Sequence, residues 1–123
     1  MNKSLKAAGG IPCSVQPIWV YSRSSDRHPR VLFEQTKELL WEAQNRGYSV
    51  AGVSQDMGSG RSMARIGLMQ MMQAVRGGFV RTVLVRDVTR LSNDPAILLK
   101  LLEFLRDCDA VLLTIRSGRP PWG

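Results

Sequence analysis

The order of apolar patterns along the chain constrains its fold more than any other feature of the sequence. Short runs rich in branched and aromatic residues, typical of buried strands, alternate with stretches whose apolar residues recur every three to four positions, as on one face of a helix. The expected strands are 18–22, 48–53, a third within 79–85 that is strongest over 82–85, and 110–115. The expected helices lie between Pro29 and Gly47, over 62–76, and from Pro95 through Leu105. This alternation predicts βαβ units, and so a three-layer, flavodoxin-like α/β domain. Its mainly parallel sheet of four to five strands has helices on both faces.

Each expected helix carries an apolar stripe that we expect to face the sheet. The first stripe consists of Leu32, Thr36, Leu39, Leu40 and Ala43. The second consists of Leu68, Met71, Met72 and Val75, and the third of Ile97, Leu98, Leu101, Leu102 and Leu105. Leu99 and Phe104 fall outside the third stripe, so either burial in a small core or a subunit contact is expected for them.

The charge of the chain favours a polyanionic partner. Its 123 residues include 17 lysines and arginines against 10 acidic residues, which gives a net charge of +7. A nucleic acid fits such a chain better than a membrane surface does, although charge alone leaves open a basic surface without a partner. The length predicts one domain, over 17–118, between a flexible leader (1–16) and a tail (119–123).

The cysteine and histidine content excludes several kinds of site. Cys13 and Cys108 are the two cysteines and His28 is the single histidine, so neither a Cys/His zinc site nor a disulfide framework can form. Few cysteines also suit a reducing cytoplasm. Every apolar run is too short to cross a bilayer, and no secretory signal is evident. We therefore expect a cytoplasmic protein with no cofactor.

Three polar loops follow the first three expected strands, over 22–30, 54–61 and 86–93. The reactive loops of a parallel sheet gather at the carboxyl ends of its strands, so chemistry is expected there. The glycine-rich loop at 56–60 does not match a phosphate-binding motif. A Walker motif would need glycine and lysine where Gln55 and Arg61 stand, and a dinucleotide motif starting at Gly58 would need glycine in place of Met63.

The first loop carries a candidate nucleophile. Arg23 and Ser25 are two residues apart, which places their side chains on one side of an extended backbone. A serine hydroxyl needs a partner that takes its proton or stabilises the developing charge. His28 is more simply explained as a surface residue. Several arginines could instead stabilise the pentacoordinate state of a phosphodiester, and Arg65 and Arg90 lie in or beside the other two loops. We expect these guanidinium groups to converge on the Ser25 hydroxyl.

Four motifs in order resemble the catalytic domain of serine recombinases, the resolvase/invertase group, over roughly 18–115. The opening Tyr-x-Arg-x-Ser matches Tyr21, Arg23 and Ser25, and the glutamine of the first helix matches Gln35. The Asp-x-x-Ser-Gly loop and the Arg-x-Gly-Leu after it match Asp56, Ser59, Gly60, Arg65, Gly67 and Leu68. The Asp-Arg-Leu-x-Arg-Asp segment aligns with residues 89–94, and Arg90 holds the position of its first arginine.

The resemblance implies a site-specific DNA recombinase with a resolvase-type fold. Ser25 would attack a DNA phosphodiester to form a 5′-phosphoserine link, Arg23, Arg65 and Arg90 would hold the non-bridging oxygens, and Tyr21 and Asp56 would complete the catalytic set. The residues implied to contact DNA are Arg23, Ser59, Arg61, Arg65 and Arg90. The family works without a metal, on double-stranded DNA, as homodimers that pair into tetramers. It continues into a long dimer helix and a DNA-binding segment, which we do not find before Gly123.

Two positions depart from the family pattern. Thr89 stands where the family has aspartate, and Asn93 stands where it has its second arginine; Asp87 lies two residues before the first. The chain is therefore either a divergent active enzyme or a catalytically impaired module that acts in dimerisation or DNA contact. A receiver-type domain is disfavoured, because the first strand ends in Arg23 instead of the carboxylates that a receiver needs.

Overall fold

The structure is a computed structural model that describes residues 16–116 of the 123-residue chain. Helices and strands alternate in the predicted order. They are β2 (Pro17–Ser24), α1 (Pro29–Asn45), β3 (Ser49–Met57), α2 (Ile66–Arg76), β4 (Thr82–Val85), the short 3-10 helix η1 (Val88–Arg90), α3 (Pro95–Asp107) and β5 (Val111–Thr114). The predicted leader, apart from Gln16, and the predicted tail lie outside the described residues.

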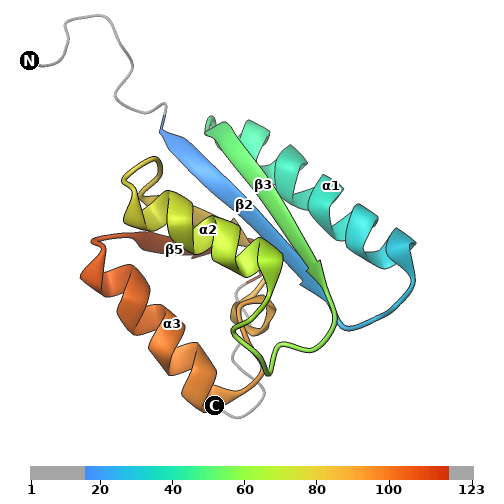
Figure 1. The fold of residues 1–123 in the computed structure, drawn as a ribbon. Coiled ribbons are helices and arrows are strands. Elements are labelled where there is room, and N and C mark those ends of the chain that lie inside the picture. Colours follow the sequence, from blue (N-terminus) through green and yellow to red (C-terminus); the bar gives the residue numbers. More distant parts are fainter. Residues whose placement is uncertain (1–15, 117–123) are drawn as a thin grey trace, which may run out of the picture.

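The four strands of this range form one parallel sheet in the order β3-β2-β4-β5. Helix α1 covers one face, and α2 and α3 cover the other (Figure 1). The predicted three-layer fold with helices on both faces is therefore confirmed. The chain runs from β2 outward to β3 and then returns to the other side of β2, so the switch point of the sheet lies between β2 and β4. Ligands of open α/β sheets bind at such a point, outside the carboxyl ends of the strands.

The core is divided by the sheet into two clusters. Under α1, the buried residues Ile18, Val20 and Leu84 of the sheet pack against Leu39 and Ala43 of the helix. The larger cluster, under α2 and α3, is built from Tyr21, Leu68, Met71, Ala74, Val75, Val80, Val83, Val85, Leu91, Leu98, Leu101 and Leu105. Because both faces of the central strands are covered, all four residues of β4 are buried, and three of them are apolar, as expected for a parallel sheet.

The first two strands along the chain, β2 and β3, are longer than their apolar patterns predict. Strand β2 continues to Ser24 and β3 to Met57, and the added residues pair as Arg23 with Asp56 and Ser24 with Met57. Arg23, Ser24 and Asp56 are therefore sheet residues, whereas the sequence placed them in loops. The apolar pattern did not predict these strand residues because their side chains are polar. The backbone pairing between β2 and β3 nevertheless continues through them.

The start of α2 also differs from the prediction. The helix begins at Ile66 and not at position 62, and its N-cap residue, Arg65, makes no capping hydrogen bond with its side chain. The Asp56 carboxylate caps this end from β3 by accepting hydrogen bonds from the backbone N–H groups of Gly67 and Leu68, both at 2.8 Å. Asp94 caps α3 with Pro95 following it, as predicted.

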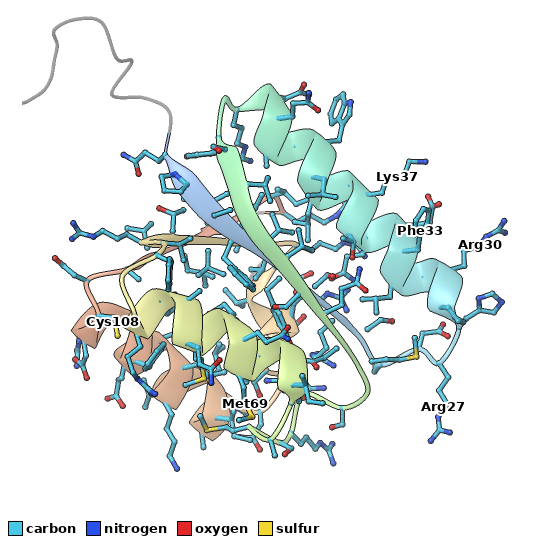
Figure 2. The ribbon with its side chains drawn as sticks, turned by 45° about the horizontal axis from the view of Figure 1, so that its top comes forward. Arg27, Arg30, Phe33, Lys37, Met69 and Cys108 are labelled. Atoms are coloured by element: carbon cyan, nitrogen blue, oxygen red, sulfur yellow. The ribbon has the colours of Figure 1, made fainter. Side chains whose placement is uncertain are left out.

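The apolar stripes are confirmed in outline but not at every position. Leu40 and Leu102 are exposed, and Gln35 takes a buried place on α1 that the periodicity did not assign. Figure 2 shows Phe33 and Lys37 projecting from the outer side of α1, away from the sheet. Leu99 is exposed, whereas Phe104 packs against the larger core cluster. Within residues 16–116, no helix is long and apolar enough to cross a membrane.

Candidate active site

A pocket of about 670 Å³ opens at the carboxyl ends of β2 and β3. It draws on the loop after β2, on the end of β3 with the loop that follows, and on the turn before α3, which agrees with the prediction that polar loops meet at this edge. Its lining consists of Ser25, Arg27, Met57, Gly58, Ser59, Arg61 and Asn93. Ser25, Ser59 and Arg61 were predicted as site residues, whereas Arg27 was not.

Ser25 is the first residue after β2 and is exposed. Its neighbour Ser24 is buried, and the Ser24 hydroxyl accepts a hydrogen bond from the backbone N–H of Asp26 at 3.1 Å. The two adjacent serines therefore differ in chemistry. The hydroxyl of Ser24 is used to close a turn, and the side chain of Ser25 lines the pocket.

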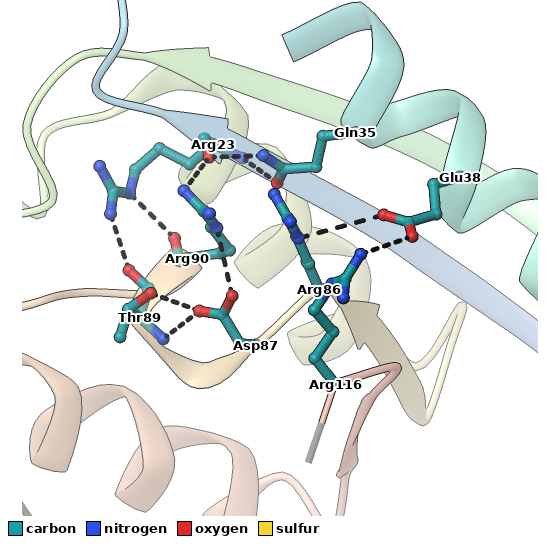
Figure 3. Close-up of polar contacts among 8 residues, drawn as sticks. All are labelled: Arg23, Gln35, Glu38, Arg86, Asp87, Thr89, Arg90 and Arg116. Carbon is teal, nitrogen blue, oxygen red and sulfur yellow. Dashed lines mark hydrogen bonds and ion pairs between the residues drawn. The ribbon is translucent and has the colours of Figure 1, made fainter. Parts of the chain in front are cut away.

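Arg23 is 2% exposed and is not among the residues that line the pocket. Its guanidinium donates to three carbonyl oxygens, those of Gly58 at 2.8 Å, Thr89 at 2.7 Å and Arg90 at 3.1 Å. Figure 3 shows the last two of these bonds. Burial lowers the pKa of the Arg23 guanidinium from its ordinary value, and the nearby charge of Arg65 lowers it further. Arg23 thus ties the loop after β3 to η1, the short helix after β4.

Two further contacts fix the position of Arg23. The Gln35 side chain of α1 donates to the Arg23 carbonyl at 3.1 Å and accepts from the Arg23 backbone N–H at 3.2 Å. At Gly60, an added Cβ would lie 2.9 Å from the Arg23 guanidinium carbon. The glutamine and the glycine that the motif comparison singled out therefore act on one arginine.

Arg65 is 8% exposed and belongs to a second buried network. It donates to the Tyr21 hydroxyl at 3.1 Å, to the Ser62 carbonyl at 2.8 Å and to the Leu91 carbonyl. The Tyr21 hydroxyl in turn donates to the Asp56 carboxylate at 2.7 Å. Burial raises the pKa of the Tyr21 hydroxyl above its ordinary value, and the hydrogen bond to Asp56 adds to the shift. Tyr21 therefore serves this network as a neutral donor.

Arg90 is the most accessible of the three predicted arginines, with 22% of its side chain exposed. It donates to the Arg23 carbonyl at 3.2 Å, and its Nε lies 3.5 Å from the Asp87 carboxylate without hydrogen-bond geometry (Figure 3). Asp87 also accepts hydrogen bonds from the backbone N–H and the hydroxyl of Thr89. The carboxylate beside Arg90 is therefore supplied by Asp87, and Thr89 holds it in place.

The predicted convergence of the arginines is correct only in part. Arg23, Arg65 and Arg90 come close enough for the charges of Arg65 and Arg90 to lower the pKa of Arg23. Their guanidinium groups donate to backbone carbonyls and to the Tyr21 hydroxyl, and none of the three lines the pocket that contains Ser25. The arginines that line the pocket with Ser25 are Arg27 and Arg61. Figure 2 shows the Arg27 side chain extending outward from the turn after β2. No motif pointed to Arg27, and its closeness to Ser25 along the chain was the one available signal.

Comparisons with known proteins agree with this architecture. Residues 18–121 match the family described as "Resolvase, N terminal domain". Among curated proteins, no sequence matches this chain significantly. One similar solved structure is the C-terminal catalytic domain of ISC1926 TnpA, an IS607-like serine recombinase. The two chains are 25% identical, with a TM-score of 0.77 over 85% of this chain and 70% of the other.

Two further solved structures share the fold. The N-terminal catalytic domain of TP901-1 integrase is 22% identical, with a TM-score of 0.73 over 81% of this chain and 77% of that one. A resolvase family site-specific recombinase from Streptococcus pneumoniae is 23% identical, with a TM-score of 0.72 over 87% and 76% of the two chains. Because the family match spans most of its length, this chain belongs to the resolvase N-terminal domain family and is a serine recombinase catalytic domain.

Proposed function

We propose that this domain cleaves and rejoins DNA phosphodiesters, with the Ser25 hydroxyl as nucleophile. The observation that supports this most is the exposed Ser25, which lines a pocket at the carboxyl ends of β2 and β3 together with Arg27 and Arg61. Ser25 Oγ gives up its proton to solvent and forms a bond to phosphorus, the bond from phosphorus to the 3′ oxygen breaks, and that oxygen takes up a proton from solvent and leaves as a 3′-hydroxyl. The product is a 5′-phosphoserine link, and attack by a 3′-hydroxyl reverses the step.

The buried arginines support the reaction electrostatically. The pentacoordinate state gains negative charge on its non-bridging oxygens, and fixed positive groups stabilise that charge without having to reorganise. We propose this role for Arg23, Arg65 and Arg90. Arg90, the most accessible of them, would contact the phosphate directly. Tyr21 and Asp56 position Arg65 through the chain of hydrogen bonds described above.

We propose double-stranded DNA as the partner and a homodimer, paired into a tetramer during strand exchange, as the working assembly. The net charge of +7 supports a polyanionic partner. Binding through Arg61, Ser59 and the site arginines would be dominated by phosphate contacts and would weaken as salt increases. A cytoplasmic location, with access to DNA, follows from this proposal.

Covalent trapping tests the proposed reaction. The domain is incubated with a pool of labelled duplexes, each carrying a nick beside a randomised sequence. The short fragment released by cleavage diffuses away, so the protein–DNA adduct accumulates and is detected on a denaturing gel. We expect an adduct with the wild-type chain and with Ser24→Ala, and none with Ser25→Ala. Ser24→Ala is the matched control, because it removes the neighbouring hydroxyl.

Two results would contradict the proposal. An adduct that survives both Ser24→Ala and Ser25→Ala would show that the nucleophile is another residue. Absence of any adduct with the wild-type chain, under conditions in which the duplexes bind, would favour the impaired module that the sequence left open.

A further inference from the structure

The pocket around Ser25 contains one of the two positions at which this chain departs from the family pattern. Asn93 lines the pocket, and the family pattern has an arginine there. An amide carries no net charge and cannot supply the electrostatic stabilisation that an arginine gives to a phosphate. In this chain, the turn before α3 therefore does not supply the positive charge that the family pattern places there for a phosphate bound at Ser25.

Arg27 and Arg61 line the same pocket and are both exposed. Within residues 16–116, no hydrogen bond or ion pair engages either guanidinium group; the backbone N–H of Arg61 bonds to Ser59. By contrast, the guanidinium groups of Arg23 and Arg65 donate to backbone carbonyls, and neither residue lines the pocket. Among the arginines of residues 16–116, Arg27 and Arg61 are thus the two that line this pocket with exposed side chains.

Arg27 lies closer to the candidate nucleophile along the chain. Its Cα is two residues from that of Ser25, so the two atoms are at most about 7 Å apart, within the reach of an arginine side chain. The turn that carries both residues is also fixed. The backbone N–H of Asp26 donates to the Ser24 hydroxyl at 3.1 Å, and the N–H of His28 donates to the Asp26 carboxylate at 2.8 Å. These bonds hold the backbone on both sides of Arg27.

The same turn is attached to the opposite wall of the pocket. The backbone N–H of Gly58 donates to the Ser24 carbonyl at 2.8 Å, and Gly58 also accepts from Arg23. Ser25 and Arg27 are therefore held against the loop after β3, where Ser59 and Arg61 lie. A fixed turn lowers the entropy cost of bringing the Arg27 guanidinium to a bound phosphate.

We propose that Arg27 contacts the phosphate attacked by Ser25 and supplies the positive charge that Asn93 does not. This inference rests on the proposed function, because it assigns a residue of the same reaction. Arg27 reaches the phosphate from the β2 loop, whereas the family arginine would reach it from the turn before α3. The site then keeps its charge although the family position is lost.

The rate of adduct formation at saturating nicked DNA tests this assignment. We expect Arg27→Ala to slow the reaction about a hundredfold, which is typical for removing one group that stabilises the transition state. Arg27→Lys keeps a charge but not the paired donors, so an intermediate rate is expected. In the Arg27→Ala background, Asn93→Arg should restore at least about tenfold, and it should accelerate the wild-type chain by less than that, because the two arginines serve one phosphate.

Arg30→Ala is the matched control. Arg30 is also exposed, lies three residues after Arg27, and extends from α1 in a different direction (Figure 2). It does not line the pocket, so its loss should leave the rate within about twofold although the net charge falls equally. Arg27→Ala should also reduce the slope of log affinity against log salt by about 0.9, as expected for one lost phosphate contact.

The outcomes separate the two proposals. If the wild-type chain forms no more adduct than Ser25→Ala, the proposed function fails, and the role of Arg27 fails with it. If the wild-type chain forms the adduct and Arg27→Ala reacts as fast as Arg30→Ala, only the assignment of Arg27 is wrong. It is also wrong if Asn93→Arg accelerates Arg27→Ala and the wild-type chain by the same factor, since the two positions would then act independently.

Discussion

Arg23 and Arg90 form a reciprocal pair, in which the guanidinium group of each residue donates a hydrogen bond to the backbone carbonyl of the other. The Arg23 guanidinium donates to the Arg90 carbonyl at 3.1 Å, and the Arg90 guanidinium donates to the Arg23 carbonyl at 3.2 Å. The two residues are 67 positions apart in the sequence. Like charges repel, and the charge of Arg90 contributes to the lowered pKa of Arg23. Carbonyl oxygens, together with Asp87, keep these cations beside each other.

Replacing Arg23 by alanine should destabilise the fold and not only the reaction. The substitution leaves the carbonyls of Gly58, Thr89 and Arg90 without their donor. We expect a loss of about 3 kcal/mol in the free energy of unfolding, measured by urea denaturation. Arg61→Ala is the control and should stay within about 0.5 kcal/mol, because that side chain is exposed. An equal effect of the two variants would mean that water replaces the Arg23 hydrogen bonds without cost.

The Tyr21 hydroxyl should make stability fall at high pH. Its pKa in the folded state is raised above the unfolded value of about 10, so the folded chain retains a proton that the unfolded chain releases. The contribution is complete below that pH and is lost as pH rises above it, with a slope of up to about 1.4 kcal/mol per pH unit. Urea unfolding between pH 9 and 11, roughly one unit on each side of the unfolded pKa, measures this slope. Tyr21→Phe should lack it, and parallel pH profiles of the two chains would contradict the prediction.

Gly67→Ala should separate α2 from β3. A Cβ at this position would overlap the Gln55 carbonyl oxygen and would lie 2.9 Å from the Asp56 carboxylate, which caps the helix. Because backbone atoms of a sheet cannot yield as a side chain can, we expect a loss of about 2 kcal/mol in the free energy of unfolding. Gln73→Ala, on the exposed side of the same helix, should be nearly neutral. A stable Gly67→Ala variant would show that the start of α2 can shift at little cost.

Restoring the family aspartate at position 89 should not help this chain. The Thr89 hydroxyl donates to the Asp87 carboxylate, so Thr89→Asp would bring two carboxylates together where a hydrogen bond now exists. We expect a loss of about 1 kcal/mol in stability and no gain in the rate of adduct formation. Thr89→Ser keeps the hydroxyl and is the matched control. A faster reaction of Thr89→Asp would indicate that Asp87 does not replace the family residue.

The layered fold could be predicted from the sequence because burial imposes local periods. Branched and aromatic runs such as Thr82–Val85 and helical stripes such as that of Leu98, Leu101 and Leu105 repeat at the spacing of the element that buries them. Caps also depend on adjacent residues, so Asp94 and Pro95 marked the start of α3. The motif residues were also recognisable from the sequence, because their order and spacing along the chain could be compared with a family pattern.

What only the tertiary structure decided is how these residues meet. Strand β2 extends to Ser24 because β3 pairs with it, and α2 begins at Ile66 because Asp56 caps it from another element. The direction in which each arginine side chain points could not be predicted from the sequence either. Arg23 and Arg65 donate to carbonyls contributed by distant loops, which leaves Arg27 and Arg61 to share the pocket with Ser25. Local periodicity cannot predict such long-range partners, because a hydrogen bond between residues far apart in the sequence depends on how the folded chain places both of them.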